Sequence, residues 1–326
     1  MRTFFAVLKN NYLRLLPRIV PVAVFIVFTM ATMVFAVYIT GVQQVKAHVA
    51  YIEQSTSEKI PQSSKSLNIT VLREKPPRSS LVTQKYDATV TADGNGGYQI
   101  ETLRSGAYKN MLMLLLSDPG ADVSHFIPER GVGVNIIGFM MMFVLMIAFF
   151  NLFTFADDKE QGQLSRIAAA PSSFGWYLSA HCVYCLSMIL PEYFLLIILK
   201  LCGWNIGFSL LQYAGLMAVL SFLGIAFALL LNTLIKKPDN ANMLGNSVTM
   251  LTSVLAGSFY SLSKDNKVLD SITKVIPQKQ FMDFTMSMQN GTASEHVGAM
   301  LYTIGFVLIL LVLSVVVLRK KYVKCI

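Results

Sequence analysis

The side chains with the most evident chemistry form one short cluster, His181-Cys182-Val-Tyr-Cys185, at the start of an apolar stretch. Imidazole and thiolate groups are zinc ligands, but a structural zinc site takes four of them. Helical spacing brings at most three of these groups together. A redox cysteine pair needs a thioredoxin-like setting, which the flanking sequence lacks. We therefore predict that this cluster serves packing.

Motifs for hydrolysis and phosphate binding are missing from the sequence. The dipeptide Gly-Lys does not occur, which excludes a P-loop, and neither H-E-x-x-H nor G-x-S-x-G is found. We expect no catalytic residues, no metal and no cofactor on this chain. The net charge is +9, but no basic face of a soluble fold accompanies it, so we expect no nucleic acid partner.

A single carboxylate stands inside a long apolar stretch, Glu192 in LILPEYFLLII. Placing it in lipid costs roughly 2.5–3.5 kcal/mol, so such a group usually faces a helix bundle or a cavity. Pro191 beside it can kink the helix. One hypothesis places Glu192 on a substrate path or at a gating joint, and the alternative is a polar contact between packed helices. Further candidates for a path are Asn151, Asn246 and Phe259.

The composition indicates that lipid is the main solvent. Of the 326 residues, 54% are hydrophobic and only 14% are charged, against about a quarter charged in soluble domains. A membrane span needs about 20 mostly apolar residues. Six stretches qualify, and the fifth, rich in Ser, Thr, Gly and Asn, is the weakest: residues 19–41, 132–155, 177–201, 209–235, 243–262 and 299–318.

Lysine and arginine near the spans predict the orientation, because these residues concentrate in cytoplasmic loops. They occur before the first span, after the second and fourth, and in the tail 319–326. Both termini are therefore expected in the cytoplasm, although four lysines fall on the outer side (Lys264, Lys267, Lys274 and Lys279).

Three segments outside the spans have patterns of their own. Residues 1–18 predict a cytoplasmic interfacial helix, with a plain extension of the first span as the alternative. Residues 42–131 predict a small extracytoplasmic α/β domain, because short β-rich runs flank the turn signal DGNGG. Residues 263–298 form an outer segment between the last two spans. The strands expected in the domain are HVAYI, LNITVL, KYDATVTA and GYQIETL, with short helices at RSSLVTQK and YKNMLMLLL.

Residues 156–176 form a polar connector that is patterned rather than merely soluble. The stretch FADDKEQGQLSRIAAAPSS, residues 155–173, covers most of it. Three acidic residues are expected in the first turns of a short helix, where the helix dipole favours negative charge. Leu164, Ile167 and Ala168 follow at helical spacing, and Pro171 ends the helix. Such an amphipathic helix can dock in a groove of another protein, and a solvated loop helix is the alternative.

Residues 158–171 resemble the cytoplasmic loop of type-2 ABC permeases, whose pattern is roughly E-K-E-x-G-T-L-E-x-L-x-x-T-P. Glu160, Gly162, Leu164 and Pro171 match, and Asp158 replaces a glutamate. The chain departs from the pattern at Gln163, Ser165 and Ala170. LAGSFYSL and ITKVIPQKQFMDFTMSMQNG, with Pro277 and Gly291, are similar to the family's fifth span and its partly re-entrant outer segment. The 42–131 region resembles the subgroup with an outer domain.

The resemblance implies an all-α polytopic membrane protein with six transmembrane helices, the permease subunit of an ATP-driven exporter in the plasma membrane. ATP and Mg would be held by a partner ABC ATPase, and a second permease copy and lipid would complete the assembly. The cargo would be hydrophobic or amphipathic. A secondary transporter and a non-transporting receptor or immunity protein are the alternatives. The implied ATPase-coupling residues are Asp158, Glu160, Gly162, Leu164, Arg166, Ile167 and Pro171.

Overall fold

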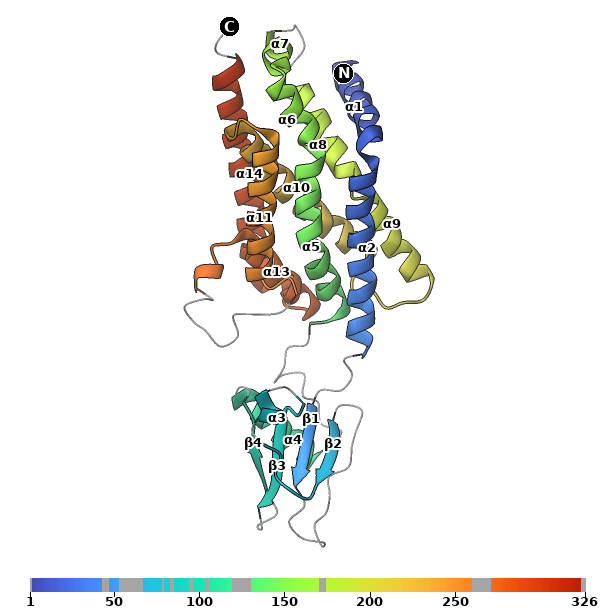
Figure 1. Cartoon of the computed structure of the whole chain (residues 1–326), viewed down its shortest axis with the longest axis vertical. Coiled ribbons are helices and arrows are strands. Elements are labelled where there is room, and N and C mark those ends of the chain that lie inside the picture. The colour runs from blue at the N-terminus through green and yellow to red at the C-terminus, as the bar shows by residue number, and fades with distance from the viewer. Residues whose placement is uncertain are drawn as a thin grey trace. The chain divides into compact units, whose positions relative to one another are not determined.

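The computed structural model describes residues 2–42, 47–52, 67–77, 79–82, 85–93, 97–103, 106–118, 130–169, 174–259 and 271–323. The chain divides into two compact units, Tyr38–Arg130 and a helical unit formed by Met1–Val37 with Gly131–Ile326. Figure 1 labels the elements of both units. The helical unit holds all the candidate functional residues.

Five helical stretches in the described part of the chain are long and apolar enough to cross a membrane. The first contains α1 (Arg2–Leu15), the short turn η1 (Leu16–Arg18) and α2 (Ile19–Val42). The second contains α5 (Val132–Asn151) and α6 (Phe153–Glu160), and the third α8 (Phe174–Ser187) and α9 (Leu190–Leu201). The fourth is α10 (Leu210–Leu234). The fifth runs through η2 (Ala293–His296), α14 (Val297–Leu318) and η3 (Arg319–Val323).

The weakest predicted span, residues 243–262, corresponds in part to α11 (Pro238–Leu255). This helix is not among the five apolar stretches, because Asn, Ser and Thr fill much of it. It nevertheless packs along α5 and α10 (Figure 1). The count of six spans therefore stays a prediction, and α11 is held among the others by its protein contacts.

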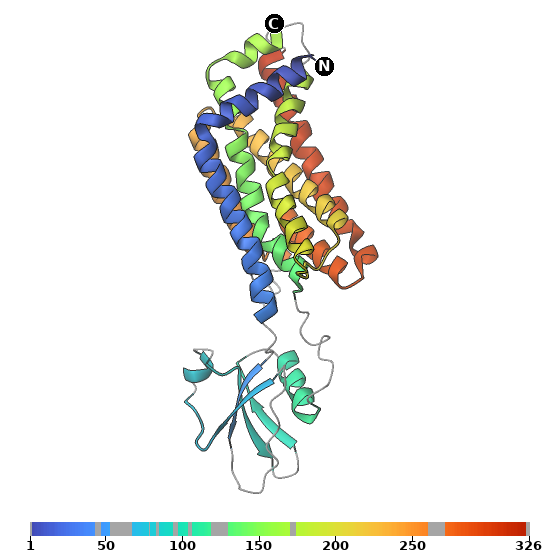
Figure 2. The ribbon, with the colours of Figure 1, turned by 90° about the vertical axis from the view of Figure 1, so that its right-hand side faces the viewer.

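Three of the long helical stretches are interrupted at identifiable residues. Pro17 lies in η1, and α1 runs at a slant to α2 (Figure 2). Leu152 separates α5 from α6. The predicted span 177–201 is divided at Met188 and Ile189, just before Pro191 in the first turn of α9. Proline lacks the amide hydrogen that a continuous helix needs, which accounts for the break.

Beyond residues 260–270, which lie outside the described residues, the chain forms α13 (Pro277–Gln289). This helix packs on α14 and α5. The side-chain oxygen of Gln289 accepts a hydrogen bond from the Gly131 amide at 2.6 Å, at the start of α5. This helix occupies much of the predicted outer segment 263–298. Its re-entrant character stays a prediction.

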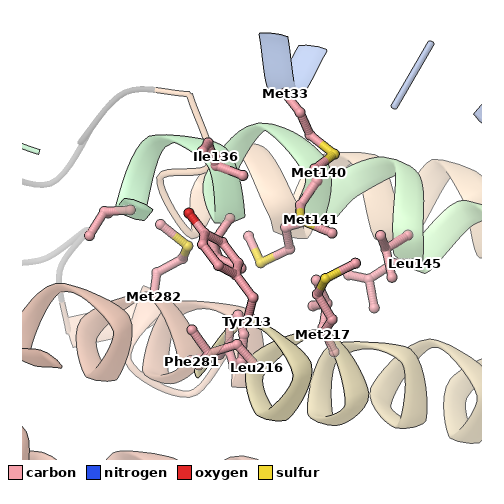
Figure 3. Close-up of a cluster of buried hydrophobic side chains, with 14 of the residues drawn as sticks. Met33, Ile136, Met140, Met141, Leu145, Tyr213, Leu216, Met217, Phe281 and Met282 are labelled. Atoms are coloured by element: carbon pink, nitrogen blue, oxygen red, sulfur yellow. The ribbon is translucent and has the colours of Figure 1, made fainter. Parts of the chain in front are cut away.

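The core of the helical unit is rich in methionine. Met33 of α2, Met140 and Met141 of α5, Met217 of α10 and Met282 of α13 meet aliphatic and aromatic side chains there (Figure 3). All five are buried. Methionine is flexible and fills irregular gaps, so this core tolerates small relative movements of its helices better than a core of branched side chains.

The second unit contains a four-stranded sheet in the order β2-β1-β3-β4. Its strands are β1 (Ala47–Ile52), β2 (Leu67–Leu72), β3 (Ala88–Asp93) and β4 (Gly97–Glu101). β1 pairs in parallel with both β2 and β3, whereas β3 and β4 are antiparallel. The four expected strands therefore form. The DGNGG turn lies largely in residues 94–96, outside the described residues.

Two helices complete this unit, α3 (Ser79–Val82) and α4 (Gly106–Ser117), where short helices were expected. α4 packs its apolar face, with Tyr108, Met111 and Leu115, on the buried side chains of the sheet. β1 is buried at five of its six residues, as a central strand covered on both faces should be. The unit is thus a small α/β domain, and its extracytoplasmic location stays a prediction.

Candidate functional site

The polar connector folds as two helices, α6 and α7 (Gln163–Ala169), with a turn at Gln161 and Gly162. Gly162 has φ of +70°, a left-handed conformation that glycine adopts without a steric penalty. Asp157, Asp158 and Glu160 occupy the end of α6, where the helix dipole disfavours carboxylates. The prediction that they begin a helix is therefore wrong.

Arginines from the N-terminal segment stabilise two of these carboxylates. Arg14 donates to Asp158 Oδ1 at 2.7 Å, and Arg18 donates to Asp157 Oδ2 at 3.0 Å. Tyr177 of α8 donates its hydroxyl to Asp158 Oδ2 at 2.7 Å. Asp158 is only 5% exposed, and both of its carboxylate oxygens accept hydrogen bonds from this chain. We call Arg14, Arg18, Asp157, Asp158 and Tyr177 the arginine–aspartate joint.

Lys159 also points inward. Its ammonium donates to the main-chain carbonyls of Asn232 and Ile235, at the end of α10. The last carbonyls of a helix have no partner within the helix, and a cation there also complements the helix dipole. Lys159 thus fastens the end of α6 to the end of α10.

The apolar stripe of α7 is buried against the last helix of the chain. Leu164 is fully buried in one cluster with Leu318, and Ile167 and Tyr322 pack against that cluster. α7 contacts η3 directly. Leu164 of the predicted stripe is therefore packed inside the chain, whereas Ile167 and Ala168 are only partly buried, and docking of the stripe in a partner stays a prediction.

A limited set of connector residues remains on the outside. Glu160, Gln161, Gly162, Ser165, Arg166 and Ala169 are exposed, at the end of the helical unit where both termini lie (Figures 1 and 2). We call these six residues the α7 outer face. Of the other coupling residues implied by the resemblance, Asp158 and Leu164 are buried, Ile167 is partly buried, and Pro171 lies outside the described residues.

Sequence reasoning missed the role of Arg14 and Arg18, which it counted only as orientation signals. A usable signal was present, since an acidic pair next to an apolar span needs a basic partner. Two arginines, Arg14 and Arg18, stand beside the first span. Which helix carries the partner depends on packing, and residue spacing does not reveal it.

In the described part of the chain, His181 is a buried side chain packed among polar and aromatic neighbours. His181 is 1% exposed, and its Nδ1 lies 3.2 Å from the Asn11 amide nitrogen and 3.4 Å from the Thr154 hydroxyl. Cys182 and Cys185 are free thiols. Among the residues that the structure describes, no group of metal-ligating side chains could hold an ion.

Three of the four candidate path residues lie in three different helices, and Phe259 follows the end of α11. Asn151 ends α5, Glu192 lies in the first turn of α9, and Asn246 lies in α11. Each has a buried polar atom with no hydrogen-bond partner among the described residues. Phe259 contacts Phe139 edge to face, with ring centroids 5.1 Å apart. α5 and α11 pack together, whereas α9 packs on α10, and the role of these four residues on a substrate path stays a prediction.

Glu192→Gln distinguishes a path residue from a packing residue. Glutamine keeps the shape and removes the charge. If Glu192 has only a structural role, we expect the variant to show unchanged or higher stability and unchanged transport. A residue on the path predicts a fall in transport of about tenfold or more, roughly 1.4 kcal/mol in the barrier. Thermal unfolding in detergent and uptake into vesicles measure the two effects. The exposed Glu295→Gln is the matched control, and transport at the wild-type rate by Glu192→Gln would contradict the hypothesis.

Five apolar helical stretches, packed together through buried side chains, define a polytopic membrane protein. Residues 122–316 match the family described as ABC-2 family transporter protein. This match covers more than half of the 326 residues, so the chain belongs to the ABC-2 transporter family. The resemblance to type-2 ABC permeases is thereby confirmed, while the outer-domain subgroup stays a prediction. A search of curated proteins gives no match to this chain. Membrane subunits of this family are generally not enzymes and normally work with an ABC ATPase.

Proposed function

We propose that this chain is the permease subunit of an ATP-driven exporter in the plasma membrane, with both termini in the cytoplasm. A separate ABC ATPase holds ATP and Mg, and this chain holds neither. Two permease subunits, identical or related, form the path for a hydrophobic or amphipathic cargo. The observation that supports the proposal is that the α7 outer face is exposed. It belongs to the helix pair α6 and α7, and α6 follows α5 directly along the chain.

The contacts of the connector supply a route for movement. A push on the α7 outer face acts on α6, whose last turn is joined to α1 through Arg14 and Asp158. The same turn is joined to α10 through Lys159. α7 itself rests on α14 and η3. Movement of the ATPase would therefore reach α1, α10 and η3, and α2 by way of α1.

Charge reversal on the α7 outer face tests the proposal. Glu160→Arg is expected to abolish ATP-driven transport and cargo-stimulated ATP hydrolysis, because a like-charge contact in an interface costs several kcal/mol. Membrane insertion should survive, since Glu160 is exposed. Gly162→Pro should do the same, because proline cannot adopt the positive φ of this turn.

The matched control is Glu295→Arg, the same change at an exposed residue outside the α6–α7 segment. Wild type and variants are purified with the co-expressed ATPase and reconstituted in lipid vesicles. Full transport by Glu160→Arg, or transport by the wild type that follows an ion gradient without ATP, would refute the proposal. The latter result would identify a secondary transporter.

A further inference from the structure

A cluster of cations extends from Arg166 of the α7 outer face onto η3. Arg166 is on α7, and Arg319, Lys320 and Lys321 are on η3, which packs against α7. All four are exposed. We call them the cationic end surface. Lys321 and Glu160 each lie within electrostatic reach of the Lys159 ammonium, so this surface continues into the α7 outer face.

None of the four cations forms an ion pair with another residue in the described part of the chain. The nearby acids are otherwise engaged, since Asp157 and Asp158 pair with Arg18 and Arg14. Glu160 is the one carboxylate of the α7 outer face. Four positive charges against one negative charge leave a surface that favours an acidic ligand.

Two ligands have that chemistry, anionic lipid headgroups and an acidic protein surface, and the position of the cations favours the protein. η3 packs against α7, and Arg166 belongs both to this surface and to the α7 outer face. A partner ATPase that contacts the α7 outer face would therefore also meet the cations of η3.

We propose that the cationic end surface binds an acidic surface of the partner ATPase, beside the contact made by the α7 outer face. This inference rests on the proposed function. It adds a second contact of different chemistry, one that guides association through opposite charge. Electrostatic contacts at the rim of an interface act mainly on the association rate and on its salt dependence.

The test compares Lys320→Glu with Lys9→Glu, an exposed lysine on α1 that carries the same charge change. Each variant and the wild type are placed in phosphatidylcholine nanodiscs. Binding of the purified ATPase that co-purifies with the wild type is measured at about 0.1 M and about 1 M salt, where the screening length falls from about 10 Å to about 3 Å. Lys320→Glu is expected to weaken binding by about tenfold at the lower salt, and high salt should remove most of the difference. Lys9→Glu should bind as the wild type does.

The possible results separate this inference from the proposed function. If the ATPase binds wild type and Lys320→Glu equally well, the inference is wrong and the proposed function stands. If Lys320→Glu instead purifies with less phosphatidylglycerol and binds the ATPase normally, the surface is a lipid site, which also overturns the inference. If no ATPase binds the wild type, the proposed function fails and the inference fails with it.

Discussion

Asp158→Asn is expected to lower the free energy of unfolding by about 2–3 kcal/mol and to uncouple transport from ATP hydrolysis. Removing one partner of a fully buried ion pair costs about 3–5 kcal/mol. The cost here is smaller because 26% of the Arg14 side chain is exposed. Asparagine keeps the shape and still accepts from Tyr177, so the lost quantity is the charge that holds Arg14. Thermal and denaturant unfolding in detergent measure the change.

A double-mutant cycle shows whether the effect belongs to the pair. Arg14→Met combined with Asp158→Asn should be less destabilised than the sum of the two single variants, because the second change no longer leaves an unpaired charge. The pair Lys279 and Asp283, 2.6 Å apart at i and i+4 within α13, is the control. Asp283→Asn should cost only about 0.5 kcal/mol or less. Strict additivity for Arg14 and Asp158 would show that the joint does not couple α1 to α6.

Gly245→Ala is expected to displace α11 and to lower the stability by about 1–3 kcal/mol, the usual cost of overpacking. A Cβ atom at this position would lie 2.0 Å from Cε1 of Phe149. The ring has little room to move, because Phe149 is fully buried and packs edge to face on Phe227. Alanine in a helix is otherwise about 1 kcal/mol better than glycine, so any loss must come from the clash.

Gly298→Ala in the first turn of α14 is the matched control, since a Cβ there meets open space. It should be neutral or slightly stabilising. The midpoint of thermal unfolding in detergent compares the two variants. If Gly245→Ala also gains stability, then α11 is not held by close contact with α5, and its place among the apolar helices needs another explanation.

These two predictions concern the same property of the molecule, which is how partly polar segments are held beside apolar ones. α11 carries Asn242, Asn246 and Ser253, and each leaves a buried polar atom unpaired within the described residues. The last four residues of α6 are all charged, three acidic and one basic. Neither segment is stabilised by hydrophobicity alone. Each depends on specific contacts, among them Gly245 with Phe149 in α11 and Arg14 with Asp158 in α6.

The helices themselves were largely predictable from the sequence. Apolar runs near membrane length indicate spans because hydropathy is a sum over neighbouring residues. The expected strands of the small domain also form, since period-two patterns and turn residues are local signals too. The connector was identified as a distinct segment for the same reason, and its family pattern lies within it.

The tertiary structure decided which side of each helix is used. The acids of the connector end a helix because the chain remains helical from α5 through α6, with only Leu152 between them, and the turn comes later, at Gly162. Asp158 pairs with Arg14, 144 residues away, and Leu164 packs beside Leu318. These contacts depend on which helices meet, and composition and spacing carry no record of that. The sequence therefore determined where this protein is apolar and helical and that it resembles other ABC-2 transporters, whereas only packing decided that Asp158, Lys159 and Leu164 of the connector face inward and that the α7 outer face stays exposed.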